Sequence, residues 1–223
     1  MTTHRTEAQI REEKIAAMGE KLGEVHFLLW KDLTWLSFEW HQYVELFGTD
    51  PTRVDIMNSS APRFFWSLDR VLWQDILLSL SRLADPPGTG GKQNLTFHRL
   101  SRLTPNDGPR TELDTAINEY EKAVKFARDW RHALFAHRDL DHAMEPDANP
   151  LAEASRASVI AAIQSAAAVM NLIELHYQKS TTAYDAVIDP IGGAYDLLYY
   201  LDLGLQARES DQAREDFWQP RFR

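Results

Sequence analysis

Apolar residues recur at intervals of three and four positions along most of this chain, and this spacing places them on one face of an α-helix. Long stretches of this kind cover four ranges: 15–43, 64–83, 113–134 and 159–173. Alternating apolar and polar positions, which would indicate strands, never run long enough to predict one. The pattern therefore predicts an all-α fold, an antiparallel helical bundle of four long helices with short helices and a C-terminal helix.

The same spacing predicts which side chains of the last three stretches face the core. In the second stretch the inward face is Phe64, Phe65, Leu68, Leu72, Ile76, Leu80 and Leu83. In the third it is Leu113, Ile117, Tyr120, Val124, Ala127, Trp130 and Leu134. In the fourth, predicted as a helix over about 151–178, it is Val159, Ile163, Ala166, Met170 and Ile173. Small alanines on this last helix favour a close approach by a neighbouring helix.

Segments rich in glycine, proline and polar residues separate the stretches, at 47–53, 85–94, 104–109 and 144–150. A short helix is predicted over 97–103, with Asn94 or Thr96 as its cap. An unbroken first helix would be about 50 Å long or more, at about 1.5 Å per residue. We therefore expect Gly19 or Gly23 to bend it, or its first turns to extend beyond the bundle.

The domain organisation follows from these elements. Residues 1–180 are predicted to form the helical bundle, and residues 181–223 a C-terminal helical extension packed on the same domain. Within the extension, a helix is predicted from Pro190 or Gly193 through Leu205.

Composition narrows the class of protein. With 223 residues, 44% of them hydrophobic, the chain can bury a substantial core. The absence of cysteine excludes disulfides and thiolate zinc sites and suits a reducing cytosol. The first residues are charged, and no apolar run approaches the roughly 18 residues of a membrane span. We therefore expect a cytoplasmic protein that does not enter a membrane and needs no cofactor.

Charge is distributed unevenly along the chain. The net charge of −9 argues against a general surface for binding polyanions. However, residues 92–138 contain nine basic and six acidic residues and so carry +3. Ordinary solvated helix faces are the first explanation of this segment, and a local nucleic-acid site is the alternative.

One cation and one imidazole flank the apolar face of the third stretch, in DWRHALFAHRDL at 129–140. If Leu134 is the centre of that face, Arg131 and His137 lie about 60° to either side of it. Removing an arginine from water costs several kcal/mol unless the charge is paired or opens into a wet cleft. Arg131 therefore needs a specific explanation.

Three explanations are open. The first is an ion pair with a carboxylate of the second stretch: Asp69, Asp75 or Asp85. The second is a metal site, but its candidate ligands lie five residues apart rather than three or four: His132, His137 and His142. The third is an active site in which Arg131 neutralises a phosphate and His137 moves a proton, since histidine has an ordinary pKa of about 6.5.

The residues of this region resemble a known family. Arg131 and His137, with His132 directly after the arginine, resemble the R-x(4 to 6)-H signature of the HEPN superfamily. Together with FFWSLDRVLWQDILLSLSRLADP at 64–86 and KQNLTFHRL at 92–100, the segment DWRHALFAHRDLD resembles the AbiU-type abortive-infection branch. The resemblance covers about residues 20–180.

This resemblance implies a metal-independent endoribonuclease. In such enzymes the ribose 2′-hydroxyl attacks the adjacent phosphorus and leaves a 2′,3′-cyclic phosphate. By analogy His137 is the acid/base residue, Arg131 holds the phosphate, and His132 orients the reacting groups. The family context is phage defence or a toxin–antitoxin system, which implies a possible antitoxin or phage component as partner.

Further arginines are candidates for binding or orienting RNA: Arg82, Arg128 and Arg138. Each has a structural alternative. Arg82 can form an interhelical pair with Asp85, and the other two can pair with Asp139 or Asp141.

The geometry of one helix also bears on assembly. Arg131 and His137 would lie about 9 Å apart along an ideal helix and about 120° apart around it. Members of the family commonly pair two copies of this helix, so the resemblance implies a homodimer with a composite site. The rival hypothesis is a noncatalytic helical module that binds RNA, nucleotide or a partner protein. Six tryptophans are expected in the core or in dimer contacts: Trp30, Trp35, Trp40, Trp66, Trp73 and Trp130.

Overall fold

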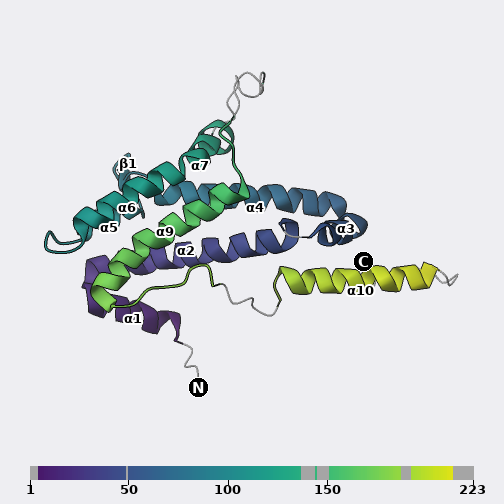
Figure 1. The fold of residues 1–223 in the computed structure, drawn as a ribbon, viewed down its shortest axis with the longest axis horizontal. Coiled ribbons are helices and arrows are strands. Elements are labelled where there is room, and N and C mark those ends of the chain that lie inside the picture. Colours follow the sequence, from purple (N-terminus) through teal and green to yellow (C-terminus); the bar gives the residue numbers. More distant parts are fainter. Residues whose placement is uncertain (1–4, 49, 137–143, 145–150, 187–191, 213–223) are drawn as a thin grey trace. The chain divides into compact units, whose positions relative to one another are not determined.

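A computed structural model of the chain describes residues 5–48, 50–136, 144, 151–186 and 192–212 (Figure 1). Its helices are α1 (Glu7–Met18), α2 (Glu20–Phe47), α3 (Pro51–Ser60), α4 (Pro62–Leu83), α5 (Phe97–Leu103), α6 (Arg110–Ala123), α7 (Lys125–Trp130), the π-helical turn η1 (Arg131–Ala136), α9 (Arg156–Gln178) and α10 (Ala194–Gln212). The all-α prediction is confirmed.

The chain divides into two compact units. The first comprises Met1–Phe38 and Gln74–Ala186, and the second comprises Glu39–Trp73 and Val187–Arg223. The predicted domain boundary near residue 180 stays a prediction.

Gly19 ends the first helix. Its φ of 80° lies in the region that only glycine adopts easily, so the chain turns there between α1 and α2. Gly23 has a different role, because a Cβ at this position would lie 2.6 Å from the Cα of Ile15. Of the two predicted bending points, Gly19 bends the chain and Gly23 lets α1 approach α2 closely.

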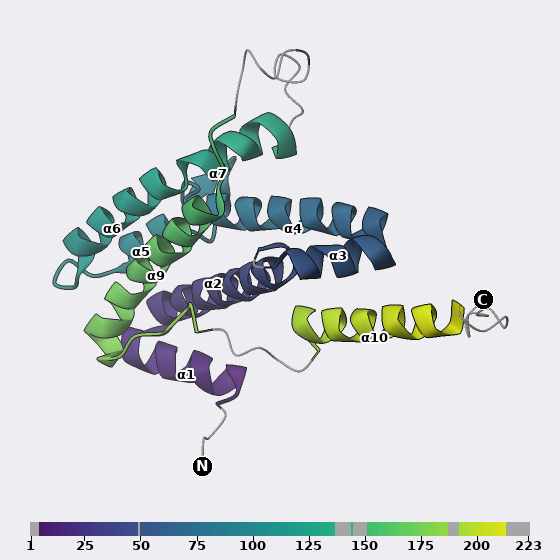
Figure 2. The ribbon, with the colours of Figure 1, turned by 45° about the vertical axis from the view of Figure 1, so that its right-hand side comes forward.

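In the core of the first unit, α6 and α9 pack side by side (Figure 2). The predicted inward residues of α9 are all buried: Val159, Ile163, Ala166, Met170 and Ile173. Five of the predicted residues of the third stretch are buried too: Leu113, Ile117, Tyr120, Val124 and Ala127. The Tyr120 hydroxyl donates a 2.6 Å hydrogen bond to the Leu80 carbonyl, which fastens α6 to α4.

By length and composition, α9 is the one described helix that could cross a membrane. Its most apolar window is 44% buried inside the structure, against α6 and the rest of the first unit. A core helix of a bundle has these properties as well.

A sealed ion pair fastens α1 to α9. Lys14 Nζ lies 2.9 Å from Glu174 Oε1, with the two side chains only 5% and 2% exposed. The Thr182 hydroxyl donates a 2.7 Å hydrogen bond to the other carboxylate oxygen. Nε2 of the fully buried His26 lies 3.7 Å from Glu174 Oε1. Burial lowers the pKa of Lys14, and the neighbouring Glu174 carboxylate partly offsets that change.

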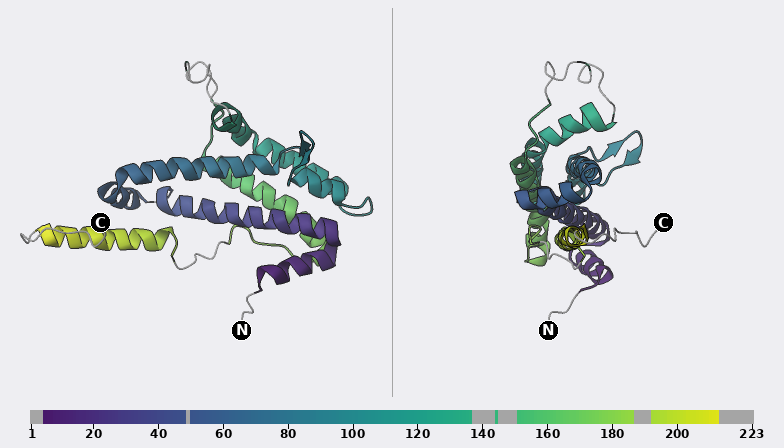
Figure 3. Two further views of the ribbon diagram at one scale, coloured as in Figure 1. Left: turned by 180° about the vertical axis from the view of Figure 1, so that it is seen from behind. Right: turned by 90° about the vertical axis from the view of Figure 1, so that its right-hand side faces the viewer.

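The loop after α4 contains a small antiparallel ladder that the sequence pattern did not predict. Strand β1 (Gly88–Thr89) pairs with β2 (Lys92–Gln93), as the arrows in Figure 3 show. Strands of two residues are too short to produce a visible alternation. Of the two predicted caps of α5, Thr96 occupies the N-cap position, although its side chain makes no capping hydrogen bond. The Asn94 side chain instead donates to the Pro86 carbonyl and to Thr89 Oγ1, at 2.8 and 3.0 Å.

The second unit has its own apolar cluster, in which α10 packs on α3. Its buried members are Leu46, Met57, Phe65, Ala194 and Leu198. Phe64, predicted to face inward, is 60% exposed. Consecutive residues of a helix point about 100° apart, so Phe65 takes the inward position and Phe64 cannot.

Two of the six tryptophans lie outside the core of the chain. Trp35 and Trp66 are 61% and 68% exposed and do not belong to the core. Whether they contact a second copy stays a prediction.

Candidate functional site

The backbone changes its winding at Arg131. α6 ends at Ala123, Val124 separates it from α7, and a π-helical turn begins where α7 ends. π-helical turns are rare and occur frequently at functional sites. The indole N–H of Trp130, directly before the turn, donates a 2.8 Å hydrogen bond to the Ala152 carbonyl. This bond fastens the end of α7 to the segment that precedes α9.

Arg131 forms an ion pair with Asp85. Nη1 of the guanidinium donates to both carboxylate oxygens, at 2.7 and 2.8 Å. Of the three carboxylates that the sequence offered, the structure selects this one. The pair is not sealed, because the side chains of Arg131 and Asp85 are 30% and 23% exposed. The arginine is thus paired and still accessible to water.

Asp85 occupies a well-defined position at the end of α4. Its backbone N–H donates to the Arg82 carbonyl at 3.1 Å, so it continues the last turn of the helix. Pro86 cannot extend the helix and starts the loop. The Asn94 side chain binds the Pro86 carbonyl and thereby holds this loop from the other side. The carboxylate that contacts Arg131 therefore projects from a restrained backbone.

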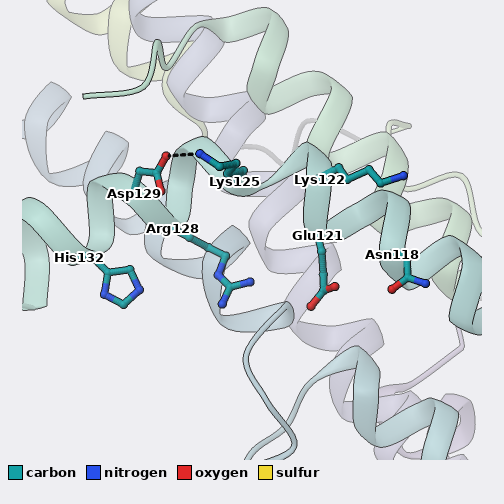
Figure 4. A pocket seen from close by; sticks show the side chains of 7 residues that line it. All are labelled: Asn118, Glu121, Lys122, Lys125, Arg128, Asp129 and His132. Atoms are coloured by element: carbon teal, nitrogen blue, oxygen red, sulfur yellow. Dashed lines mark hydrogen bonds and ion pairs between the residues drawn. The ribbon is translucent and has the colours of Figure 1, made fainter. Parts of the chain in front are cut away.

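Next to the motif, the faces of α6 and α7 form a cavity of about 670 Å³ (Figure 4). Its lining residues are Asn118, Glu121, Lys122, Lys125, Arg128, Asp129 and His132. The set contains three permanent cations and two carboxylates, so the cavity is locally basic within an acidic protein.

Within this cavity the charges are only partly compensated. Lys125 pairs with Asp129 at 3.2 Å, and Glu121 lies 3.0 Å from the imidazole of His98. Arg128 forms no ion pair with any residue that the structure describes. Figure 4 shows the Arg128 guanidinium and the His132 imidazole pointing to the same side of the helix, as residues four apart do.

The structure brings some predicted site residues together and separates others. Arg128 and His132 share the cavity, whereas the Arg131 guanidinium is directed to Asp85. Arg82 lies elsewhere: it lines a second cavity of about 210 Å³ together with Asp32 and Asp75. Burial raises the pKa of Asp32, and the charge of Arg82 partly offsets this.

The predicted ion pair between Arg82 and Asp85 is not formed among the described residues. No ion pair joins them in the part of the chain that the structure describes, since the carboxylate binds Arg131. His137 and Arg138 lie outside the described residues, as do Asp139 and Asp141. The separation of Arg131 from His137 therefore stays a prediction.

Sequence reasoning missed several lining residues of the cavity as site residues: Asn118, Glu121, Lys122 and Lys125. A signal was present, because these positions recur at intervals of three and four along the polar face of the third predicted helix, which the structure divides into α6 and α7. The described residues contain no group of three or more histidine and acidic side chains that could hold a metal ion.

The sequence of the chain matches one known protein family. The family model HEPN AbiU2, described as AbiU2, matches residues 19–197. No curated protein and no solved structure matches the chain. The matched range contains Asp85, Arg131 and every lining residue of the basic cavity. The protein therefore belongs to the AbiU2 family of HEPN proteins, a family associated with abortive infection.

Proposed function

We propose that this protein is a metal-independent endoribonuclease that acts in abortive infection. The observation that carries the proposal is the partly exposed arginine at position 131, which lies beside a basic cavity on the same helical segment. In the proposed reaction a ribose 2′-hydroxyl loses its proton and attacks the adjacent phosphorus. The bond from phosphorus to the 5′-oxygen breaks, that oxygen takes up a proton, and a 2′,3′-cyclic phosphate remains.

Arg131 supplies the permanent positive charge. As the 2′-oxygen attacks, negative charge builds up on the non-bridging oxygens of the phosphate. A guanidinium can donate two parallel hydrogen bonds to such a group and keeps its charge at every physiological pH. Stabilisation of charge that develops in the transition state is commonly the largest single contribution to enzymatic rate.

His137 is proposed to move the protons, and His132 to orient the RNA. The His132 side chain is exposed and lines the basic cavity, so it is accessible to a bound strand. Lys122, Lys125 and Arg128 are proposed to bind neighbouring phosphates. RNA affinity should then fall as salt concentration rises, because binding releases counterions.

The proposal includes a homodimer with a composite site. His137 follows Arg131 by six positions, which on one helix would place the two side chains too far apart for a tight site. A second copy would bring another histidine toward the arginine across a two-fold axis. Light scattering at micromolar protein concentration should show twice the mass of the 25.6 kDa chain. A monomer would remove the composite site from the proposal.

The test uses RNA incubated with the protein in excess EDTA. Wild-type protein should produce fragments with cyclic-phosphate and 5′-hydroxyl ends, and Arg131→Ala and His137→Ala should not. Arg63→Ala is the matched control, since it removes an exposed arginine of α4 in the other unit and should cleave like wild type. Equal cleavage by Arg131→Ala would reject the assignment. RNA binding that is sensitive to salt but gives no product would support the noncatalytic binding module instead.

A further inference from the structure

We propose that Asp85 is a positioning residue for Arg131, and that it holds the guanidinium so that its Nε and Nη2 face the RNA phosphate. The inference rests on the proposed function. Asp85 does not contact substrate in this scheme and acts only through the arginine.

The pattern of hydrogen bonds supports this role. A guanidinium has five N–H donors on three nitrogens. Both contacts to the Asp85 carboxylate come from one nitrogen, Nη1, which carries two of those donors. Among the described residues, none accepts a hydrogen bond from Nε or Nη2. Of the remaining three donors, the Nε–H and one N–H of Nη2 lie on the adjacent edge of the guanidinium.

This edge, which no described residue occupies, has the right chemistry for a phosphate. Nε and Nη2 present two parallel N–H groups, which match two oxygens of a phosphate in a bidentate contact. The side chain is 30% exposed, so a strand in the solvent can reach it. Asp85 binds the guanidinium through Nη1, and Nε and Nη2 stay available to the anion.

Both partners of the ion pair are mounted on restrained backbone. The Tyr120 hydroxyl binds the Leu80 carbonyl and fixes the end of α4 against α6. The Trp130 indole binds the Ala152 carbonyl and fixes the end of α7. An arginine side chain has several rotatable bonds, and a fixed carboxylate restricts it to one direction. Asp85 therefore orients the Arg131 side chain before RNA binds.

The negative charge of Asp85 should affect RNA affinity and cleavage rate in opposite directions. A carboxylate beside a phosphate site repels the phosphate, so Asp85 should weaken RNA binding. Its benefit lies in orientation, which raises the rate of the chemical step. Removing the carboxylate should thus separate the two quantities: RNA binds as well or more tightly, and cleavage slows.

The experiment compares single-turnover cleavage and RNA affinity for Asp85→Ala, Asp85→Asn and Asp85→Glu in EDTA. We expect Asp85→Ala to cleave at least tenfold more slowly with equal or tighter RNA binding. Asp85→Asn keeps one acceptor oxygen and should be intermediate, and Asp85→Glu should recover part of the rate. Asp55→Asn, an exposed carboxylate of α3 in the other unit, is the matched control.

Three results would overturn the proposal. Wild-type cleavage by Asp85→Ala would show that Arg131 needs no positioning. Faster cleavage would identify Asp85 as an inhibitory counter-ion. A parallel loss of cleavage and affinity would also reject it, since that outcome indicates a distorted fold rather than a misdirected arginine.

A second measurement separates this inference from the proposed function. The Nε–H signal of Arg131, assigned by its loss in Arg131→Lys, is followed by nitrogen-15 NMR while inorganic phosphate is added. In wild type the signal should shift, and in Asp85→Ala it should be broadened and shift less. An unperturbed wild-type signal contradicts the positioning role. A shift without any RNA cleavage contradicts only the ribonuclease assignment.

Discussion

Two ion pairs in the first unit have nearly the same length and different surroundings. Lys14 and Glu174 lie 2.9 Å apart and are 5% and 2% exposed. Arg131 and Asp85 lie 2.7 Å apart and are 30% and 23% exposed. A sealed pair cannot exchange its partner for a solute, whereas an open one can admit a phosphate. Exposure rather than distance therefore distinguishes the structural pair from the candidate catalytic one.

The largest expected effect comes from breaking the sealed pair. Glu174→Ala leaves the Lys14 ammonium buried without its counter-ion, and this should lower the free energy of unfolding by about 3–5 kcal/mol. Asp85→Ala leaves Arg131 accessible to water and should lower it by about 1 kcal/mol or less. Urea denaturation of both variants measures the difference. Equal losses would show that the two pairs are alike.

The second largest effect is expected from acid, which should lower the free energy of unfolding through the buried His26. Burial, followed by the Lys14 charge, lowers the pKa of His26 to about 3. In the unfolded chain a histidine takes up a proton below about pH 6.5, while the folded protein resists protonation until about pH 3. Stability is therefore lost as pH falls through this window, by at most about 1.4 kcal/mol for each pH unit.

A variant isolates this contribution of His26. His26→Leu lacks the imidazole, so its unfolding free energy should fall less than that of wild type between pH 7 and pH 5. Urea denaturation at the two pH values provides the comparison. The same decline in both proteins would assign the acid sensitivity to other groups.

Tyr120→Phe tests the contact that holds the end of α4 near the open pair. The variant keeps the aromatic ring and removes the donor to the Leu80 carbonyl. We expect a loss of about 1 kcal/mol in unfolding free energy, the usual net value of one buried hydrogen bond. Thermal unfolding checks this, and an unchanged midpoint would show that the hydroxyl contributes nothing there.

The smallest effect on stability is expected at the rim of the cavity. Lys125→Ala removes an exposed cation whose pair with Asp129 is open to solvent. Stability should be unchanged, while RNA affinity falls several-fold and its salt dependence becomes shallower. Fluorescence anisotropy across a salt series measures both. Lys92→Ala, in the exposed ladder after α4, is the control, and equal effects of the two variants would deny the cavity a special role.

The sequence predicted the helical core well because burial repeats along each helix. Every residue of α9 that the spacing predicted to face inward is buried, since each turn contributes one more apolar residue. The spacing did not identify three further buried positions of this helix, Ala162, Val169 and Glu174. The same logic identified Arg131 as a cation in an unusual place. It could not choose Asp85 from the candidate carboxylates, because that choice depends on how α4 and α7 approach each other.

The sealed pair escaped sequence analysis for a related reason. Lys14 lies in a charged stretch that resembles a solvated helix face, and Glu174 is 160 positions away. Nothing local to either residue indicates the other. The π-helical turn was missed as well, because apolar spacing over six residues does not distinguish it from an α-helical turn.

Arg131→Lys tests the central claim most directly. Lysine keeps the positive charge at position 131 and removes the planar fork that binds two phosphate oxygens. Single-turnover RNA cleavage in EDTA should fall at least tenfold while RNA affinity stays within a few-fold of wild type. Cleavage at the wild-type rate would contradict the account, because an open, oriented guanidinium at this position would then have no role in the reaction.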